Sequence, residues 1–173
     1  MSCTVHYRVR QAEERDLDAL ARFEAQIAQN SFPDNPIVDL AAHRKRLAKA
    51  MARDAEGMLV AEDERSHQLL GWLWVSLNQN FTTGARYANF RSLALAPEAV
   101  GSPVADDLFQ RGIDFARAGD AEEVVGKVNV SNVPMRLVYR KFRFHVQHLT
   151  MRRRLVGSQD LDEVPVVEGT EQG

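Results

Sequence analysis

Residues 93–112, LALAPEAVGSPVADDLFQRG, join an apolar strand to a helix through a short loop that contains glycine and proline. Apolar residues indicate the strand over 87–96, and apolar residues at helical spacing indicate the helix over 102–118. A second apolar run predicts a further strand over 124–130. A helix that connects two neighbouring strands of one sheet makes them parallel, so this region predicts a parallel strand pair with a helical crossover.

The remaining segments predict a mixed α/β fold with the order β-α-α-β-β-β-α-β-α-β. A breaker-rich loop, NSFPDNP, separates the first two helices, and a polar turn, DERSHQ, joins two strands into a hairpin. The other predicted strands span 5–10, 58–62, 69–77 and 145–153, and the other helices span 17–30, 39–53 and 132–142.

The length is typical of a single-domain protein, and the near balance of charges does not support sequence-independent binding of nucleic acid. The chain has 173 residues, 45% of them hydrophobic, and 22 basic residues against 24 acidic ones. No apolar run is long enough to cross a bilayer, the first ten residues do not form a secretion signal, and the single cysteine permits no intrachain disulfide. We therefore expect a cytoplasmic protein with one domain over 1–156 and an acidic, flexible tail over 157–173.

The loop after the 87–96 strand has the properties of an anion-binding site. The start of a helix carries unpaired N–H groups and a partial positive charge, which attract phosphate without a side-chain cation. Gly101 permits backbone angles that direct successive amides at one point, Ser102 is a favourable N-cap, and Pro103 favours the first helical position. The same residues are also typical of a helix that is only capped, and the loop alone leaves both interpretations open.

A second motif lies at residues 132–144, NVPMRLVYRKFRF. Together with the loop it resembles the GNAT superfamily of N-acetyltransferases. In that family a strand that ends in P-E-x-[R/Q]-G-x-G-x-[G/A] precedes a helix, and N-x-x-A-x-x-L-Y-x-K-x-G-F follows a later strand. The resemblance covers residues 7–154, and the order of elements agrees with it. It implies the acyl-CoA N-acyltransferase fold, a central mixed sheet flanked by helices.

The resemblance implies that the loop amides hold the pyrophosphate of acetyl-CoA and that the preceding strand pairs with the pantetheine arm. Pro97-Glu98 and Gly101 match the loop motif, whereas Val100 stands where the family has Arg or Gln. Pro103 replaces the second glycine, and because it has no N–H the loop loses one donor, worth about 1.5–3 kcal/mol when the acceptor is charged. The cofactor-binding residues predicted in this way are Leu93, Ala94, Leu95, Val100, Gly101, Ser102, Val104, Ala105, Asn132 and Tyr139.

Tyr139 matches the tyrosine whose hydroxyl protonates the departing CoA thiolate in the family, and Asn132 matches the asparagine that contacts the cofactor. An amine that attacks a thioester expels a thiolate, and a nearby phenol can supply a proton or a hydrogen bond as charge develops. Tyr139 is therefore the predicted catalytic residue, with a packing tyrosine on an amphipathic helix as the alternative. Lys141 and Phe144 also match, while Arg143 replaces the glycine of the motif.

No general base is evident on the strand before the loop, where related enzymes place Glu or His. Asn89 and Arg91 occupy those positions, and neither is a good base, although Asn89 can order a water that passes the proton on. The other candidates are Glu24 on the first helix and His145 or His148 on the last predicted strand.

Aromatic side chains offer candidate walls for an acceptor pocket. Phe32, Phe81 and Tyr87 lie in or beside the loops that shape this pocket in related enzymes, and a structural role is the alternative. Trp72 and Trp74 share one strand face and are expected in the core or in an interface.

These patterns predict a GNAT-type acyltransferase that transfers an acetyl group from acetyl-CoA to a primary amine of a small molecule, peptide or protein by direct attack, without a metal. Val100, Pro103 and the missing base favour one alternative, a non-catalytic CoA-binding or regulatory module. A second alternative, an acyltransferase that uses a different acyl donor, applies if the altered loop holds pyrophosphate poorly. We expect neither a nucleic-acid nor a membrane partner, and we expect a homodimer only by analogy with related enzymes.

Overall fold

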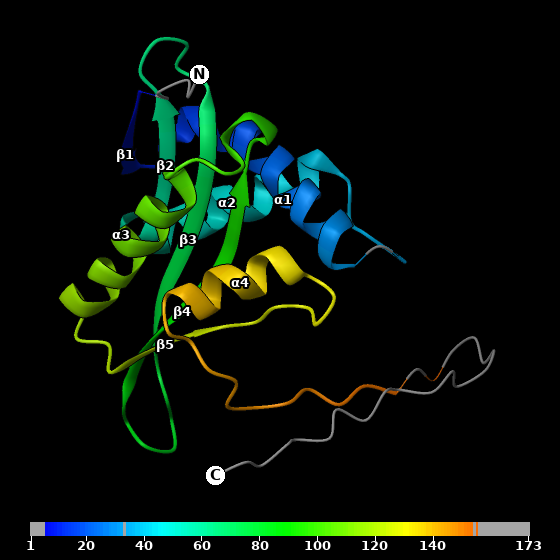
Figure 1. Ribbon diagram of the computed structural model, residues 1–173, viewed down its shortest axis with the longest axis vertical. Helices are drawn as coiled ribbons and strands as arrows, with labels where there is room; N and C mark the ends of the chain where they lie inside the picture. Colours follow the sequence, from blue (N-terminus) through cyan, green and yellow to red (C-terminus); the bar gives the residue numbers. More distant parts are fainter. Residues whose placement is uncertain (1–5, 33, 154, 156–173) are drawn as a thin grey trace.

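The computed structural model describes residues 6–32, 34–153 and 155, so the predicted acidic tail lies outside the described residues. Within these ranges no helix has the length and apolar character needed to cross a membrane. The centre of the fold is a five-stranded sheet in the order β1-β2-β3-β4-β5 (Figure 1). The strands are β1 (Tyr7–Gln11), β2 (Met58–Asp63), β3 (Leu69–Gln79), β4 (Arg86–Leu95) and β5 (Glu123–Gly126). The helices are α1 (Leu17–Ser31), α2 (Leu40–Asp54), α3 (Val104–Ala118) and α4 (Val133–Lys141), with short 3-10 turns η1 (Glu14–Asp16), η2 (Ala55–Gly57) and η3 (Pro97–Ala99).

The sheet is antiparallel from β1 to β4 and parallel between β4 and β5. The parallel pairing runs from Tyr87 opposite Glu123 to Phe90 opposite Gly126. Since α3 connects these two strands, the predicted crossover helix and the predicted parallel pair are both confirmed. The predicted hairpin is confirmed as well, because β2 and β3 pair antiparallel across the polar turn.

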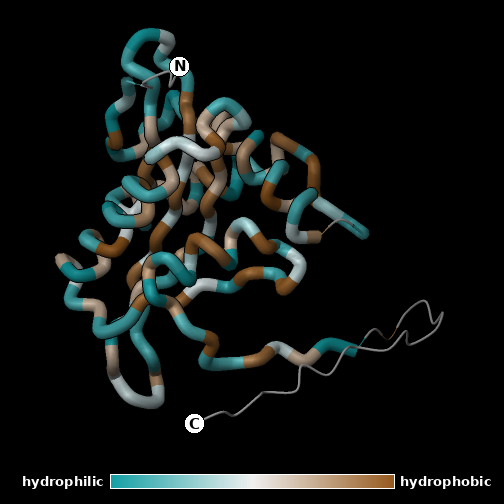
Figure 2. The backbone as a smooth tube through the Cα atoms, viewed as in Figure 1, coloured by the Kyte–Doolittle hydropathy of each residue, from teal (hydrophilic) through white to brown (hydrophobic). Residues whose placement is uncertain are grey.

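Helices cover both faces of the sheet (Figure 1). α1 and α2 cover one face, where Trp72 and Trp74 of β3 lie in a buried cluster with Leu47 of α2. α3 and α4 cover the other face, where Phe90 of β4 packs edge-on against Phe109 of α3 with ring centroids 4.7 Å apart. Figure 2 shows that the strands between these layers are largely hydrophobic. Trp72 and Trp74 are therefore core residues, as one of the two sequence interpretations predicted.

The predicted last strand over 145–153 is wrong. This segment is coil, and Figure 1 shows it running away from the sheet after α4. Its apolar side chains Val146, Leu149 and Met151 are 81%, 81% and 88% exposed. Alternation of polar and apolar residues gives a segment two faces, but a strand also requires a partner edge, and β5 offers only four residues.

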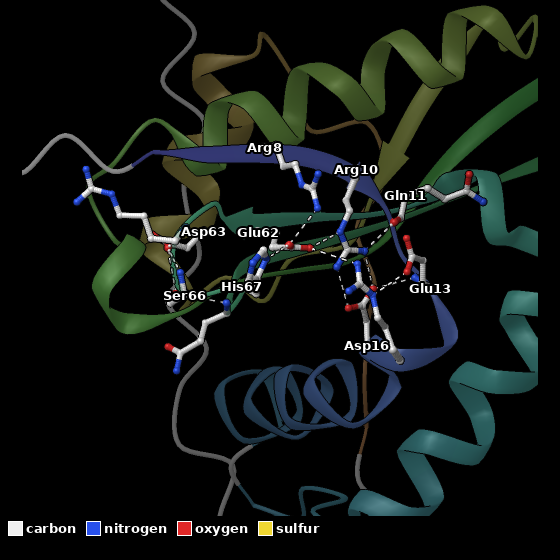
Figure 3. Close-up of polar contacts among 12 residues, drawn as sticks. Arg8, Arg10, Gln11, Glu13, Asp16, Glu62, Asp63, Ser66 and His67 are labelled. Carbon is white, nitrogen blue, oxygen red and sulfur yellow. Dashed lines mark hydrogen bonds and ion pairs between the residues drawn. The ribbon is translucent and has the colours of Figure 1, made fainter.

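A buried carboxylate connects β1 with β2 and with the turn after β2 (Figure 3). Glu62 is 1% exposed and accepts hydrogen bonds from Arg8 at 3.2 Å, from Arg10, and from the Nδ1 of His67 at 2.8 Å. Arg10 also donates to both carboxylate oxygens of Asp16, at 2.7 and 2.9 Å, directly before α1. The hydrogen bonds from His67 and the two arginines lower the pKa of Glu62 to about 2. This Glu62 cluster (Arg8, Arg10, Asp16, Glu62 and His67) holds β1 against the hairpin and the start of α1.

Candidate active site

β4 and β5 separate after a short pairing. The last pair is Phe90 opposite Gly126, whereas β4 continues to Leu95 and remains paired with β3. At the same point Arg91 is an extra residue on β4, because Phe90 and the residue after Arg91 face consecutive residues of β3. Such a bulge bends a strand and increases its twist, which accounts for the separation. We call the place where Phe90 faces Gly126 and the strands part the fork.

Beyond the fork, the outer edge of β4 has backbone groups without a strand partner. The N–H of Ala96 donates to the carbonyl of Leu70 at 2.9 Å, so Ala96 faces the β3 side. Backbone groups alternate in direction along a strand, so Leu93 and Leu95 direct theirs away from β3. In agreement, the Leu95 carbonyl accepts a hydrogen bond from the side chain of Gln26 at 3.3 Å. An extended ligand chain can pair with such an edge as an additional strand would.

The loop between β4 and α3 is open at Gly101. This residue has a φ of 81°, in the left-handed region that favours glycine, and nothing lies within 4 Å of the position that a Cβ would take. α3 begins at Val104, two residues later than the sequence predicted. Ser102 still contributes to the cap, because its hydroxyl accepts the N–H of Val104 at 3.3 Å and donates to the carbonyl of Ala99 at 2.6 Å.

Fewer loop amides are free than the family motif implies. The N–H groups of Val100 and Ser102 donate to carbonyls of η3 at 3.3 and 3.1 Å, and that of Val104 donates to the Ser102 hydroxyl. Pro103 has no N–H. In the part of the chain that the structure describes, the free amides at the start of α3 are those of Gly101, Ala105 and Asp106. Three donors and the helix dipole therefore remain for an anion.

The first turn of α3 is acidic, which opposes the binding of an anion there. Asp106 forms an ion pair with Lys141 of α4, and Asp107 accepts a hydrogen bond from the hydroxyl of Tyr7 at 2.5 Å. Lys141 therefore offsets one of the two charges and connects α4 to α3.

Asn132 caps α4. Its Oδ1 accepts the N–H of Met135 at 3.2 Å, and Pro134 lies in the first turn, where a missing N–H costs nothing. The capping role explains why an asparagine begins the motif, and it leaves the side-chain NH2 as the part of Asn132 able to reach a ligand. The predicted contact between Asn132 and the cofactor stays a prediction.

α4 ends in a Schellman motif that fixes the position of Tyr139. The N–H of Phe144 donates to the carbonyl of Tyr139 at 3.0 Å, and the N–H of Arg143 donates to the carbonyl of Arg140 at 3.0 Å. Arg143 is the left-handed residue of this motif, with a φ of 63°, and it stands where the family has glycine. The ring of Phe144 packs on that of Tyr139 with centroids 4.9 Å apart. The spacing Y-x-x-x-R-F in this chain is therefore the spacing of a helix end.

The hydroxyl of Tyr139 lies at the fork. A Cβ added to Gly126 would overlap this hydroxyl, so the phenol lies directly against the last residue of β5. Phe109 of α3 holds the ring from one side, edge-on, with centroids 5.5 Å apart. Burial raises the pKa of Tyr139 to about 12.

An open pocket of about 620 Å³ lies on the α1–α2 side of the fork. β4 residues 89–92 and Lys127, the first residue after β5, line it, so it reaches both strands where they part. Trp74 forms part of the wall, and among the buried side-chain polar atoms described its Nε1 is the one without a hydrogen-bond partner. Ile27, Phe32 and Ile37 add apolar surface.

The pocket brings together several residues that the sequence singled out. Asn89, Arg91, Glu24 and Phe32 line it. Other candidates are placed elsewhere: Phe81 is exposed in the β3–β4 loop, Tyr87 faces Glu123 within the sheet, and His145 and His148 are exposed in the coil after α4.

Glu24 is the buried charge of this pocket. Its side chain accepts a hydrogen bond from the Nε1 of Trp72 at 2.9 Å and forms an ion pair with Arg46 of α2. Glu24 itself is 4% exposed. Because both oxygens are held in place, the carboxylate is preorganised to bind a cationic group that enters the pocket.

His43 is a pocket residue that the sequence interpretation missed. It is buried, and its Nε2 lies 2.7 Å from the carbonyl of Ile37. A carbonyl only accepts, so Nε2 carries the proton and Nδ1 is the acceptor of the neutral ring. The available signal was helical spacing, since His43 lies on the same face of α2 as buried Leu47 and Ala50.

Comparison with family models gives no match, and a search of curated proteins gives none either. Solved structures do match. An acetyltransferase from Trypanosoma brucei superposes with a TM-score of 0.65 at 17% identity, over 87% of this chain and 100% of its own. Glucosamine-6-phosphate N-acetyltransferase from Arabidopsis thaliana gives 0.64 at 14% identity, over 87% and 99%. The aminoglycoside N-acetyltransferase AAC(6')-Iy, in a structure with CoA, gives 0.68 at 14% identity, over 89% and 97%.

The fold is that of the GNAT acyl-CoA N-acyltransferases. The matches cover nearly the whole length of each relative, and the mixed five-stranded sheet with its flanking helices is the shared framework. The fold that the two sequence motifs implied is therefore confirmed.

Proposed function

We propose that this protein is an N-acetyltransferase that moves an acetyl group from acetyl-CoA to a primary amine. The observation that carries the proposal is the arrangement around the fork. Tyr139 reaches the fork from the α3–α4 side, and the pocket opens from the α1–α2 side. The unpaired edge of β4 runs from the fork toward the free amides of the loop. A thioester seated along this edge would present its carbonyl carbon between the phenol and the pocket.

The described residues fit a CoA thioester with a reduced set of donors. The N–H groups of Gly101, Ala105 and Asp106 are free for pyrophosphate oxygens. The backbone of Leu93 and the N–H of Leu95 have no strand partner and can pair with the pantetheine amides, whereas the Leu95 carbonyl already accepts the side chain of Gln26. The missing donor at position 103 and the acidic first turn of α3 both weaken the site. We expect binding roughly 10- to 100-fold weaker than a full set of amides would give.

In the proposed reaction the amine attacks the carbonyl carbon, a C–N bond forms, and the C–S bond breaks with its electron pair moving to sulfur. Tyr139, with a pKa of about 12, stays protonated at neutral pH and donates a hydrogen bond to this sulfur. A thiol has a reference pKa of about 8.5, so complete proton transfer from the phenol would be unfavourable by about 5 kcal/mol. Tyr139 therefore acts as a hydrogen-bond donor. The proton that the amine loses passes to the general base and from there to the CoA thiolate, so the products are the amide and free thiol.

The amine must reach the fork without its extra proton. We assign His43 the role of general base, through Nδ1 or through a water held near Asn89, because its Nε2 is already committed to Ile37. Glu24 binds the amine while it is still an ammonium ion. His145 and His148 have no part in the proposal, since both lie in exposed coil.

The test combines calorimetric titration of acetyl-CoA with measurement of free thiol across a panel of primary amines. Saturable binding and amine-dependent thiol release are expected. Release that does not depend on the amine would reduce the activity to thioester hydrolysis and would contradict the proposal.

A non-catalytic CoA-binding module is the second candidate, and the small number of free amides in the loop before α3 favours it. It would bind acetyl-CoA without turnover on any amine. If no CoA thioester binds and a carrier-protein thioester supports turnover, the acyl donor is different.

A further inference from the structure

The acceptor pocket carries an excess of positive charge. Arg46, Arg91 and Lys127 line it, against the single carboxylate of Glu24. The whole chain, in contrast, has a formal net charge of −2. Cations gathered in a concave site of an acidic protein focus a positive potential there and attract anions.

Two of these cations have no carboxylate partner among the residues described. Arg46 pairs with Glu24, but Arg91 and Lys127 form no ion pair. They flank the fork, Arg91 at the bulge of β4 and Lys127 directly after β5, and both line the pocket. An anionic group in the pocket beside the fork would therefore meet both.

The side chain of Arg91 stacks on a tryptophan of the pocket wall. Its guanidinium lies over the ring of Trp74, 4.8 Å from the centroid, and Arg46 lies 5.9 Å from the same ring. A guanidinium stacked on an aromatic face keeps its N–H edge free for bidentate contact with a carboxylate or a phosphate. Trp74 itself is 3% exposed, so this platform is rigid.

We propose, on the basis of the function proposed above, that the acceptor is a small amine that also carries a carboxylate or phosphate group. Arg91 and Lys127 bind the anionic group, Glu24 binds the amino group, and Ile27, Phe32 and Ile37 contact the carbon skeleton. Polyamines and other polycations are poor substrates because the same cations repel them.

The experiment compares amines in matched pairs: O-phosphoethanolamine with ethanolamine, β-alanine with propylamine, and glucosamine 6-phosphate with glucosamine, with spermidine as the polycation. At least one acid-bearing member should have a kcat/KM ten or more times that of its neutral partner, and added salt should reduce this preference. Comparison of the phosphate-bearing pairs with the carboxylate-bearing pair shows which of the two anionic groups the pocket prefers. Equal rates within every pair, or preference for spermidine, would overturn the proposal.

Two variants test whether Arg91 and Lys127 cause the preference for acid-bearing amines. Arg91→Met replaces the guanidinium over Trp74 with an uncharged side chain, and Lys127→Gln removes the other charge. Each should raise KM for the acid-bearing amine at least tenfold while kcat/KM for the neutral partner stays within about threefold. Arg65→Gln removes an exposed cation from the β2–β3 turn and should change neither. Equal losses for both members of a pair in Arg91→Met would count against anion binding.

Direct binding separates this inference from the function on which it rests. O-phosphoethanolamine and ethanolamine are titrated by NMR against the protein without acetyl-CoA. Selective binding of the phosphate compound, lost in Arg91→Met, upholds the charged pocket even if no thiol is released. Turnover of neutral amines without any preference upholds the acetyltransferase and removes the pocket assignment.

Discussion

The hydroxyl of Tyr139 lies against the α-carbon of Gly126, so closely that a methyl group on Gly126 would occupy the same space. Gly126 is the last residue of β5 that pairs with β4, and Tyr139 is held in place by the Schellman motif at the end of α4. The contact therefore joins a helix end to the point where the sheet opens. It makes the position of the phenol depend on the absence of a side chain at residue 126.

Gly126→Ala should displace the phenol. The new methyl group would overlap the hydroxyl of Tyr139, while Phe109 and Phe144 pack on its ring. The hydroxyl therefore has to move away from the fork. We expect the free energy of unfolding to fall by about 1–3 kcal/mol and amine-dependent thiol release to fall at least tenfold. Gly84→Ala also changes a glycine, in the β3–β4 loop where a Cβ has open space. Because its φ of 76° favours glycine, this variant should lose about 1–2 kcal/mol of stability while its turnover stays unchanged. Normal turnover in Gly126→Ala would place the reacting sulfur elsewhere.

Tyr139→Phe removes the hydroxyl and keeps the ring contacts. Loss of one preorganised donor to a developing charge costs about 2.7–4 kcal/mol, so kcat should fall roughly 100- to 1000-fold. Affinity for acetyl-CoA should change less than about threefold in calorimetry, since the loop and the β4 edge are untouched. A kcat within twofold of the wild type would show that Tyr139 only packs.

The order of strands and helices up to α4, the parallel pair and the two motifs could be read from the sequence because each rests on local chemistry. Periodicity defines α3, and a helix between two strands of one sheet leaves little choice of topology. The Y-x-x-x-R-F spacing is likewise local, because a Schellman motif spans only six residues. The position of Tyr139 at the helix end followed from the same motif, whereas its contact with Gly126 did not.

Features that depend on tertiary packing could not be read in this way. Whether 145–153 forms a strand depends on a partner edge, and alternation carries no information about that edge. His43 and Arg46 belong to the pocket because of how α2 packs on α1, and the strand bulge that turns Arg91 toward Trp74 leaves no mark in the sequence. The use of the Val104 amide by Ser102 depends on a hydroxyl rotamer.

Arg143→Gly should stabilise the fold. Arg143 has a φ of 63°, a conformation that costs a non-glycine residue roughly 1–2 kcal/mol, while the added freedom of glycine in the unfolded chain offsets part of this gain. A net gain of about 0.5–1 kcal/mol, or a rise in Tm of about 1–4 °C, is expected in thermal unfolding. Arg140→Gly places glycine inside α4 and should lower Tm. A lower Tm in Arg143→Gly would mean that the arginine side chain makes a contact worth more than the strain.

Pro103→Ala should tighten the binding of acetyl-CoA. Pro103 has φ −66° and ψ −9°, which alanine adopts without strain, so the change adds an N–H at the start of α3. If that N–H faces the pyrophosphate, Kd in calorimetry should fall about tenfold, as one further hydrogen bond to a charged group implies. Pro97→Ala, on the other side of Gly101, is the control and should leave Kd within about twofold. An unchanged Kd in Pro103→Ala would show that this position points away from the cofactor.

Glu62 should make the stability of the fold sensitive to acid. Its pKa is lowered to about 2, against about 4.3 for an unperturbed glutamate, so its contribution is complete above about pH 5 and is lost as the pH falls toward 2. Glu62→Gln removes the charge that Arg8, Arg10 and His67 share, and should lower the free energy of unfolding at pH 7 by roughly 2 kcal/mol or more. Urea unfolding between pH 7 and pH 3 should show this difference shrinking as the pH falls. Glu98→Gln, at an exposed position in η3, should stay within about 0.5 kcal/mol of the wild type at pH 7. A difference between Glu62→Gln and the wild type that grows toward pH 3 would reverse the sign and show that the cluster does not hold Glu62 ionised.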